Sequence, residues 1–175
     1  MKILLSILLT GTLLTNSIYD YSITTIEGAT HTLQEYQGKK ILLTILPITQ
    51  TADDSAYLHR IDSLALADSG SLVIIGVPSY EDGYADSLLT TLQPFYRGLL
   101  DTSVLITTGM YTHQSSDILQ NPLFNWLTHV NGNTHFEEEV EGACQMYFIN
   151  PQGDLYGVIG PHGRFSNTIL NDLMQ

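Results

Sequence analysis

Two apolar runs constrain the fold of this chain more than any other feature. Residues 41–46 and residues 72–77 are almost entirely aliphatic; Gly70 precedes the second run and Gly76 lies near its end. Apolar runs without polar alternation are typical of strands that lie inside a parallel sheet with both faces covered. Between them, residues 53–68 carry apolar side chains at helical spacing, and the inward stripe is predicted to be Ala56, Leu58, Ile61, Leu64 and Ala65. The sequence therefore predicts a strand–helix–strand unit.

Shorter elements flank this unit. Before it, an alternating segment at residues 19–23, a turn at 27–28 and an extended piece at 30–33 predict a β-hairpin, followed by one helical turn closed by Gly38. After it, the pattern predicts a helix at 85–92, a strand at 104–107, a helix at 117–130, a β-hairpin at 145–160 and a last helix at 165–174 capped by Ser166 or Asn167. This order predicts an α/β protein with a thioredoxin-like fold, in which a mixed central β-sheet has helices on both faces and an N-terminal β-hairpin.

The charge balance excludes one class of partner. The chain has 18 Asp and Glu against six Lys and Arg, which gives a formal net charge of −12. Neutralising phosphates requires clustered Lys and Arg, so we expect no nucleic-acid partner. An apolar content of 43% and a charged content of 14% fit a compact globular protein, and 175 residues suffice for one domain with a sizeable core.

Residues 1–17 have the pattern of a targeting segment. Lys2, an apolar stretch at residues 3–14 and the small residues Thr15 and Ser17 follow the order of a signal peptide. Polar residues interrupt the stretch, and it is too short to be expected to span a bilayer. We therefore predict a mature chain that starts near Ile18 and an extracytoplasmic protein, periplasmic or secreted. A cytosolic protein whose first residues form a strand or a helix is the alternative.

Three segments carry a family resemblance. They are the opening IYDYSITTIEGATHTLQEYQGKKILLTIL, the segment NPLFNWLT at residues 121–128, and YFINPQGDLYGVIGP at residues 147–161. The second resembles the hPLYkWLk helix of the glutathione peroxidase family, and the third resembles the strand–turn–strand after that family's tryptophan motif. The resemblance implies a divergent member of this family, which belongs to the thioredoxin-like superfamily, with one domain at residues 18–175.

The resemblance also indicates what the chain lacks. The family's nucleophilic cysteine or selenocysteine, in NVASkCG, falls on Gln50. Its catalytic glutamine, in FPCNQFG, falls on Glu81, and the tryptophan and asparagine of WNF fall on Ala143 and Cys144. Peroxide reduction needs a thiolate or selenolate, and an amide cannot be oxidised and recycled. The resemblance therefore implies that no catalytic set is intact and that peroxidase activity is absent.

Cys144 is the single cysteine of the sequence, so one chain cannot run a two-cysteine redox cycle. One interpretation is that Cys144 is a buried, inert, small hydrophobic side chain. The alternative is a relocated thiol beside Gln50, which would make the protein a thiol-dependent peroxidase or oxidoreductase of the oxidative-stress response. Neighbouring charges oppose that alternative, because four glutamates and no Lys or Arg lie near Cys144 in sequence.

The remaining candidates concern binding. The segment SYEDGYAD at residues 79–86 follows a predicted central strand, where α/β proteins bind ligands. The acidic run at residues 136–142 is interpreted as a solvated loop, with a calcium site, or a metal site shared with His129 and His135, as the alternative. We expect no cofactor, no metal, and an unknown small molecule or protein as the partner of a non-catalytic binding or scaffolding protein. The candidate ligand-binding residues are Gln50, Tyr80, Glu81 and Cys144.

Overall fold

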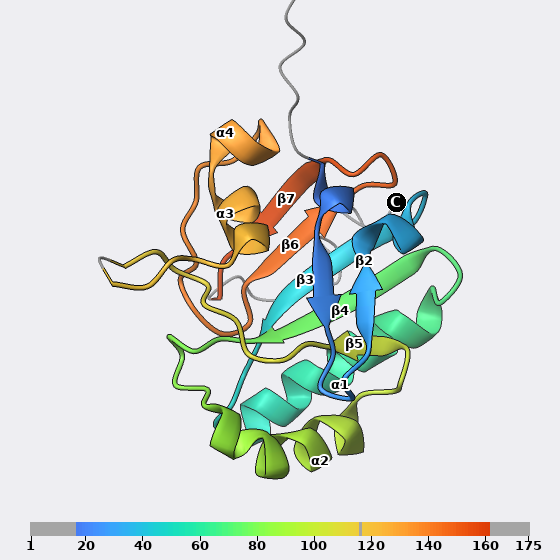
Figure 1. Cartoon of the computed structure of the whole chain (residues 1–175). Helices are drawn as coiled ribbons and strands as arrows, with labels where there is room; N and C mark the ends of the chain where they lie inside the picture. Colours follow the sequence, from blue (N-terminus) through green and yellow to red (C-terminus); the bar gives the residue numbers. More distant parts are fainter. Residues whose placement is uncertain (1–16, 116, 162–175) are drawn as a thin grey trace, which may run out of the picture.

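The computed structural model describes residues 17–115 and 117–161 (Figure 1). Of the predicted signal peptide only Ser17 belongs to the described residues. The predicted last helix, with its caps Ser166 and Asn167, lies outside them. Among the described residues, no helix combines the length and the apolar character that crossing a membrane requires.

The centre of the structure is a five-stranded mixed sheet with the strand order β5-β4-β3-β6-β7. Strands β3 (Lys40–Leu46), β4 (Leu72–Pro78) and β5 (Val104–Ile106) run parallel to one another. Strand β6 (Met146–Ile149) runs antiparallel to β3, and β7 (Leu155–Ile159) runs antiparallel to β6. The two apolar runs of the sequence are β3 and β4, which pair directly. The predicted mixed sheet is confirmed.

Both faces of β3 and β4 are covered, which explains why these strands are apolar throughout. On one face, Leu42 and Ile74 belong to a core cluster with helices α1 (Ala52–Ala67) and α2 (Leu89–Leu99). On the other face, Leu43 and Ile75 belong to a cluster with α3 (Pro122–Thr128) and the N-terminal segment. Figure 1 shows α1 and α2 together at the bottom of the view, and α3 with α4 (Val130–Asn133) at the top. The predicted helices on both faces are confirmed.

The N-terminal hairpin is also confirmed, although it starts later than predicted. Strands β1 (Ser22–Thr24) and β2 (Thr30–Thr32) pair antiparallel. Residues 19 and 20, where the alternation predicted extended structure, belong to the 3₁₀ helix η1 (Ile18–Asp20) instead. A capping box explains the difference, because Ser17 accepts from the N–H of Tyr19 at 3.3 Å and Asp20 accepts from the N–H of Ser17 at 2.8 Å.

The predicted helical turn after the hairpin is the 3₁₀ helix η2 (Leu33–Tyr36). The chain turns away just beyond it at Gly38, where a φ of +86° favours glycine. The helix predicted at residues 53–68 is α1, but its buried stripe differs in one place. Ala56 is exposed and Tyr57 is buried, because the hydroxyl of Tyr57 hydrogen-bonds Thr44 inside the core.

Two helix boundaries were predicted wrongly, both at a proline. The helix predicted at residues 85–92 is the 3₁₀ turn η3 (Asp86–Leu88) followed by α2, which continues through Pro94. The helix predicted from residue 117 begins at Pro122, since proline needs no N–H donor in the first helical turn. Asn121 caps α3, because its side chain accepts from the N–H of Leu123 at 2.9 Å. Trp126 and Leu127 are buried.

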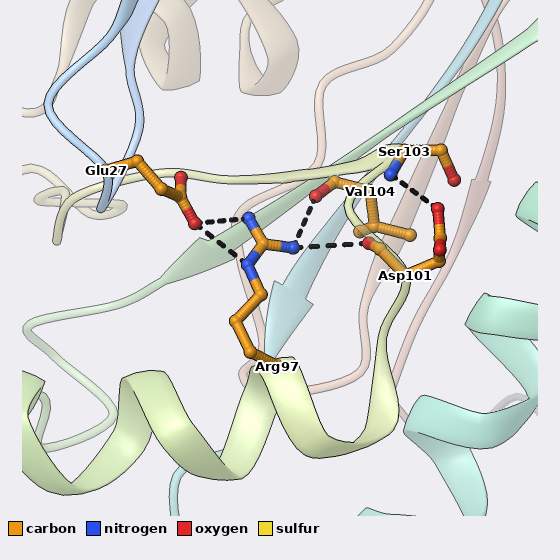
Figure 2. A network of polar contacts seen from close by, with 5 residues as sticks. All are labelled: Glu27, Arg97, Asp101, Ser103 and Val104. Carbon is orange, nitrogen blue, oxygen red and sulfur yellow. Dashed lines mark hydrogen bonds and ion pairs between the residues drawn. The ribbon is translucent and has the colours of Figure 1, made fainter.

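Arg97, near the end of α2, joins the hairpin turn to the start of β5 (Figure 2). Its Nε and Nη2 donate to Oε1 of Glu27 at 2.8 and 2.6 Å. Its Nη1 donates to the carbonyls of Asp101 and Val104 at 3.2 and 3.0 Å. Partial burial by itself raises the pKa of Glu27, but the hydrogen bonds and the charge of Arg97 outweigh it and hold that pKa below its ordinary value.

The hairpin covers the outer side of β5. The N–H of Ile26 donates to the carbonyl of Ile106 at 2.9 Å, and the N–H of Thr108 donates to the carbonyl of Thr24 at 2.9 Å. Thr25 also forms an antiparallel bridge with Thr107. The carbonyl of Ile106 at the end of this edge strand, and the residues directly after it, are therefore paired with the first part of the chain.

Candidate functional site

Four loops meet at the edge of the sheet where β3 and β4 end. Because β3 and β4 are parallel, the segments that follow them leave the sheet at the same edge. The segment before β6 enters there too, and the N–H of Cys144 donates to the carbonyl of Ile45 at 2.9 Å. The segment after β5 joins them, since the N–H of Tyr80 donates to the carbonyl of Met110 at 3.1 Å. These carboxyl-edge loops are residues 47–51, residues 79–88, residues 107–115 with 117–121, and residues 134–145.

The four residues to which the family resemblance pointed lie in loops at this edge. Gln50 lies in the first loop, Glu81 in the second, and Ala143 and Cys144 in the fourth. The loops also touch one another. A Cβ atom on Gly83 would lie 3.4 Å from Ile48, and a Cβ atom on Gly142 would lie 3.5 Å from Oδ1 of Asp82. The second loop therefore lies against both the first and the fourth.

Gln50 is exposed and sits just before α1, with a φ of +56°. Thr51 caps the helix, because its Oγ1 accepts from the N–H of Asp54 at 3.2 Å. In return, Oδ2 of Asp54 accepts from the N–H of Thr51 at 3.1 Å and from Oγ1 of Thr49 at 2.5 Å. A helix N-terminus normally lowers the pKa of a nearby thiol. Here the chain's own carboxylate already occupies that electropositive end.

Glu81 works as an anchor between two loops. Its Oε2 accepts from the N–H of Thr112 at 2.9 Å, from the hydroxyl of Thr112 at 3.1 Å and from the hydroxyl of Ser79 at 3.1 Å. Partial burial alone raises the pKa of Glu81, but these hydrogen bonds outweigh it and lower the pKa overall. Glu81 is thus an ionised group that fixes the course of the loop after β5, and Oε2 has little remaining capacity for a ligand.

Tyr80 lies in an aromatic cluster. Its ring centroid is 4.5 Å from that of Tyr111 and 5.5 Å from that of Tyr84. Its hydroxyl donates to Oδ1 of Asp86 at 2.8 Å. Burial and the neighbouring Asp86 raise the pKa of Tyr80 to about 12. Tyr80 and Tyr84 pack against Gly109, where a Cβ atom would lie 2.4 Å from Tyr84 and 2.8 Å from Tyr80. Only glycine leaves room for this packing.

Cys144 is half-buried against the core cluster of α1 and α2. Its φ of +71° is in the left-handed region, which a non-glycine residue adopts rarely. Burial is the main reason that the pKa of Cys144 rises to about 12, and the charges of Asp54 and Asp82 raise it further. The geometry favours the interpretation of Cys144 as an unreactive packing residue. Ala143, its half-buried neighbour, offers no hydrogen-bond donor at all.

Asp82 is the least satisfied polar group of this edge. Its Oδ2 is buried and has no hydrogen-bond partner among the described residues. Burial raises the pKa of Asp82, Glu81 raises it further, and His113 partly offsets the two. An unpaired carboxylate next to a thiol opposes ionisation of that thiol.

The acidic run is held by local main-chain contacts. Glu137 accepts from the N–H of Val130 at 2.7 Å, and Nε2 of Gln145 donates to the carbonyl of Glu139 at 3.2 Å. Nδ1 of His129 lies 3.0 Å from the carbonyl of Asn125 on α3. In residues 17–115 and 117–161, no group of three or more His, Cys, Asp or Glu side chains is placed to hold a metal ion.

Tyr111 and Thr112 are the site residues that sequence reasoning missed. One orients Tyr80 and the other orients Glu81. The sequence held a signal for both residues. A third parallel strand that ends near residue 106 places the residues after it at the same edge of the sheet.

Solved structures resemble this one in fold. Trgpx in its apo form matches with a TM-score of 0.64 and 14% identity over 91% of this chain and 93% of that chain. GPX1 of T. cruzi matches with a TM-score of 0.60 and 14% identity over 91% and 95% of the two chains. A thiol:disulfide interchange protein of the thioredoxin family from Chlorobium tepidum TLS matches at 0.57, with 11% identity over 88% and 90%. The fold is thioredoxin-like.

The predicted fold class is thereby confirmed, and the structural neighbours of this thioredoxin-like protein include glutathione peroxidase-like proteins. No protein-family model matches the sequence, and no curated protein matches it. Identities of 11–14% show shared fold alone. What the protein does must therefore be argued from its own side chains.

Proposed function

We propose that this thioredoxin-like protein is a divergent, non-catalytic relative of the glutathione peroxidases that acts as a binding protein outside the cytoplasm. The observation that carries the proposal is the state of Cys144, the only thiol in the sequence. With a pKa of about 12, its thiolate amounts to roughly one part in 10⁵ at neutral pH. The thiolate is the form that attacks peroxide, so the group needed for turnover is almost absent.

The surroundings of Gln50 support the same proposal. Gln50 stands where the family places its nucleophile, and an amide has no redox chemistry. The adjacent helix N-terminus is capped by Asp54, so even a thiol placed there would meet a negative charge. Glu81, at the position of the family's glutamine, is an ionised anchor rather than a donor that could receive a leaving oxygen.

A peroxidase assay tests this proposal directly. We expect the purified protein to consume neither hydrogen peroxide nor a lipid hydroperoxide, with either glutathione or reduced thioredoxin as the electron donor. The matched control is a Cys144→Ser variant, which should give the same background rate. Turnover above a thiol-free blank that disappears in Cys144→Ser would establish the thiol-dependent alternative and overturn the proposal.

The location outside the cytoplasm rests on the pattern of residues 1–17. We expect intact-mass measurement of the natively expressed protein to show a chain that begins near Ile18, and fractionation to recover it outside the cytoplasm. A mature chain that keeps Met1 and stays in the cytosol would contradict this part of the proposal and leave the argument about Cys144 untouched.

A further inference from the structure

We infer that the carboxyl-edge loops form a docking surface for a basic segment of another protein, centred on Tyr80 and Tyr111. The inference rests on the proposed binding function and names the class of partner. The site it assigns combines exposed aromatic and apolar side chains with loops that contain no Lys or Arg.

The apolar part of this surface is concentrated in two of the loops. Six large apolar side chains are exposed in the described residues. Four of them lie in the second and third loops: Leu88, Tyr111, Ile118 and Leu119. Leu119 is 83% exposed and lines a cavity of about 380 Å³ together with Gln114, Pro122 and Asn125. The N–H of Asn121 donates to the carbonyl of Tyr111 at 2.8 Å, so the main chain between Leu119 and Pro122 pairs with the main chain of Tyr111. Exposed apolar side chains gathered in this way typically mark an interaction site.

The aromatic pair is already held in a fixed arrangement. Tyr111 is 39% exposed and stacks on Tyr80 with an interplanar angle of 36°. Behind Tyr80 lies Tyr84, which is buried, and the hydroxyl of Tyr80 is bound to Asp86. A rigid tyrosine loses little conformational entropy when a partner binds, and tyrosine is enriched among residues that dominate binding energy.

Charge decides which partner fits. The four loops contain no Lys or Arg, and they carry eight acidic residues: Glu81, Asp82, Asp86, Asp117, Glu137, Glu138, Glu139 and Glu141. The Lys and Arg residues in the described part of the chain lie elsewhere. Lys39 and Lys40 are at the start of β3, Arg97 is beside the start of β5, and Arg60 is within α1. A surface of this sign attracts cationic partners, and tyrosine rings next to carboxylates bind Lys and Arg through cation–π contacts.

A second copy of this chain is a poor occupant for the same reason. Each copy has a formal net charge of −12, and two carboxyl edges brought together would repel each other. The surface therefore fits a partner segment that carries Arg or Lys with an adjacent aliphatic side chain, the cation over Tyr111 and the aliphatic group in the cavity beside Leu119.

The test is calorimetric titration with the peptide (Gly-Arg-Leu)₄, compared with its charge-reversed counterpart (Gly-Glu-Leu)₄. We expect the arginine peptide to bind with a Kd below about 1 mM at low salt, weaker at higher salt, and the glutamate peptide not to bind. Tyr111→Ala should weaken binding by about threefold or more, whereas Tyr111→Phe, which keeps the ring, should stay close to wild type. Asp86→Asn should weaken it more than the charge-matched control Asp68→Asn, which lies just after the far end of α1.

Three results would each overturn the inference. They are no binding of the arginine peptide at 1 mM, equal binding of the two peptides, and equal affinities for wild type and Tyr111→Ala. Concentration-dependent dimers that vanish in Tyr111→Ala would instead assign the patch to a second copy. A protein that neither turns over peroxide nor binds the peptide refutes the docking surface alone, whereas peptide binding together with Cys144-dependent turnover refutes the non-catalytic assignment alone.

Discussion

Iodoacetamide should alkylate Cys144 roughly 10³ times more slowly in the folded protein than in the unfolded chain at pH 8. In the unfolded chain the thiol has an ordinary pKa of about 8.5, so roughly a quarter of it is thiolate at this pH. In the folded protein, burial and the charges of Asp54 and Asp82 raise the pKa to about 12. Because only the thiolate reacts, the ratio of the two ionised fractions sets the ratio of the rates.

The pH dependence distinguishes a raised pKa from simple shielding. The folded-state rate should keep rising tenfold per pH unit up to the alkaline limit of the fold, while the unfolded-state rate should level off above about pH 9. Asp82→Asn removes one of the two charges that oppose ionisation, so it should speed the folded-state reaction. Asp68→Asn removes the same charge at a remote position and serves as the control. A folded-state rate equal to the unfolded one would show that Cys144 is an accessible, ordinary thiol and would revive the peroxidase alternative.

Replacing Gly76 with alanine should lower the free energy of unfolding by about 1–3 kcal/mol. Gly76 lies inside β4, and a Cβ atom there would lie 2.7–2.9 Å from three side-chain atoms of Leu46. Leu46 is fully buried in the cluster beneath α1 and α2, so it has no free space to move into. Urea unfolding of the two proteins measures the difference.

A double-mutant cycle with Leu46 identifies the cause. Leu46→Ala alone should cost about 2–5 kcal/mol, because it removes buried atoms and leaves a cavity. In that background the Cβ of Gly76→Ala no longer meets the leucine, so the second substitution should be close to neutral. Equal effects of Gly76→Ala in both backgrounds would mean that the close approach of Leu46 is not the source of the destabilisation.

Most of the sheet could be read from the sequence because burial on two faces leaves a strong signal. The strands β3 and β4 need apolar side chains at every position, and α1 between them needs its own periodic stripe. Helix ends were harder, since Pro122 looks the same in sequence whether it starts a helix or interrupts one. Tyr57 was missed as a core residue because the polar partner of its hydroxyl, Thr44, lies on β3, and the periodicity of α1 does not show that contact.

The edge of the sheet at which the candidate residues lie was predictable from the sequence, and the ionisation of their side chains was not. Strand ends place Gln50, Glu81 and Cys144 at one edge, which follows from the order of elements alone. The ionisation of Glu81 and of Cys144 depends on burial and on neighbours from other segments. Hydrogen bonds from Thr112 help to lower the pKa of Glu81, whereas burial, with smaller contributions from Asp54 and Asp82, raises the pKa of Cys144. These contacts follow the irregular course of the loops, for which sequence periodicity gives no rule.

The closure of β5 by the hairpin and Arg97 has a consequence for how this protein meets other chains. An edge strand with free main-chain groups is a template on which a second polypeptide can add a strand, either as a ligand or as the first step of aggregation. In this protein the outward carbonyls of Val104 and Ile106 are already taken by Arg97 and Ile26. Strand addition at this side would first have to displace the protein's own N-terminal hairpin. The segment from Ile18 to Thr32 therefore blocks extension of the sheet by another chain.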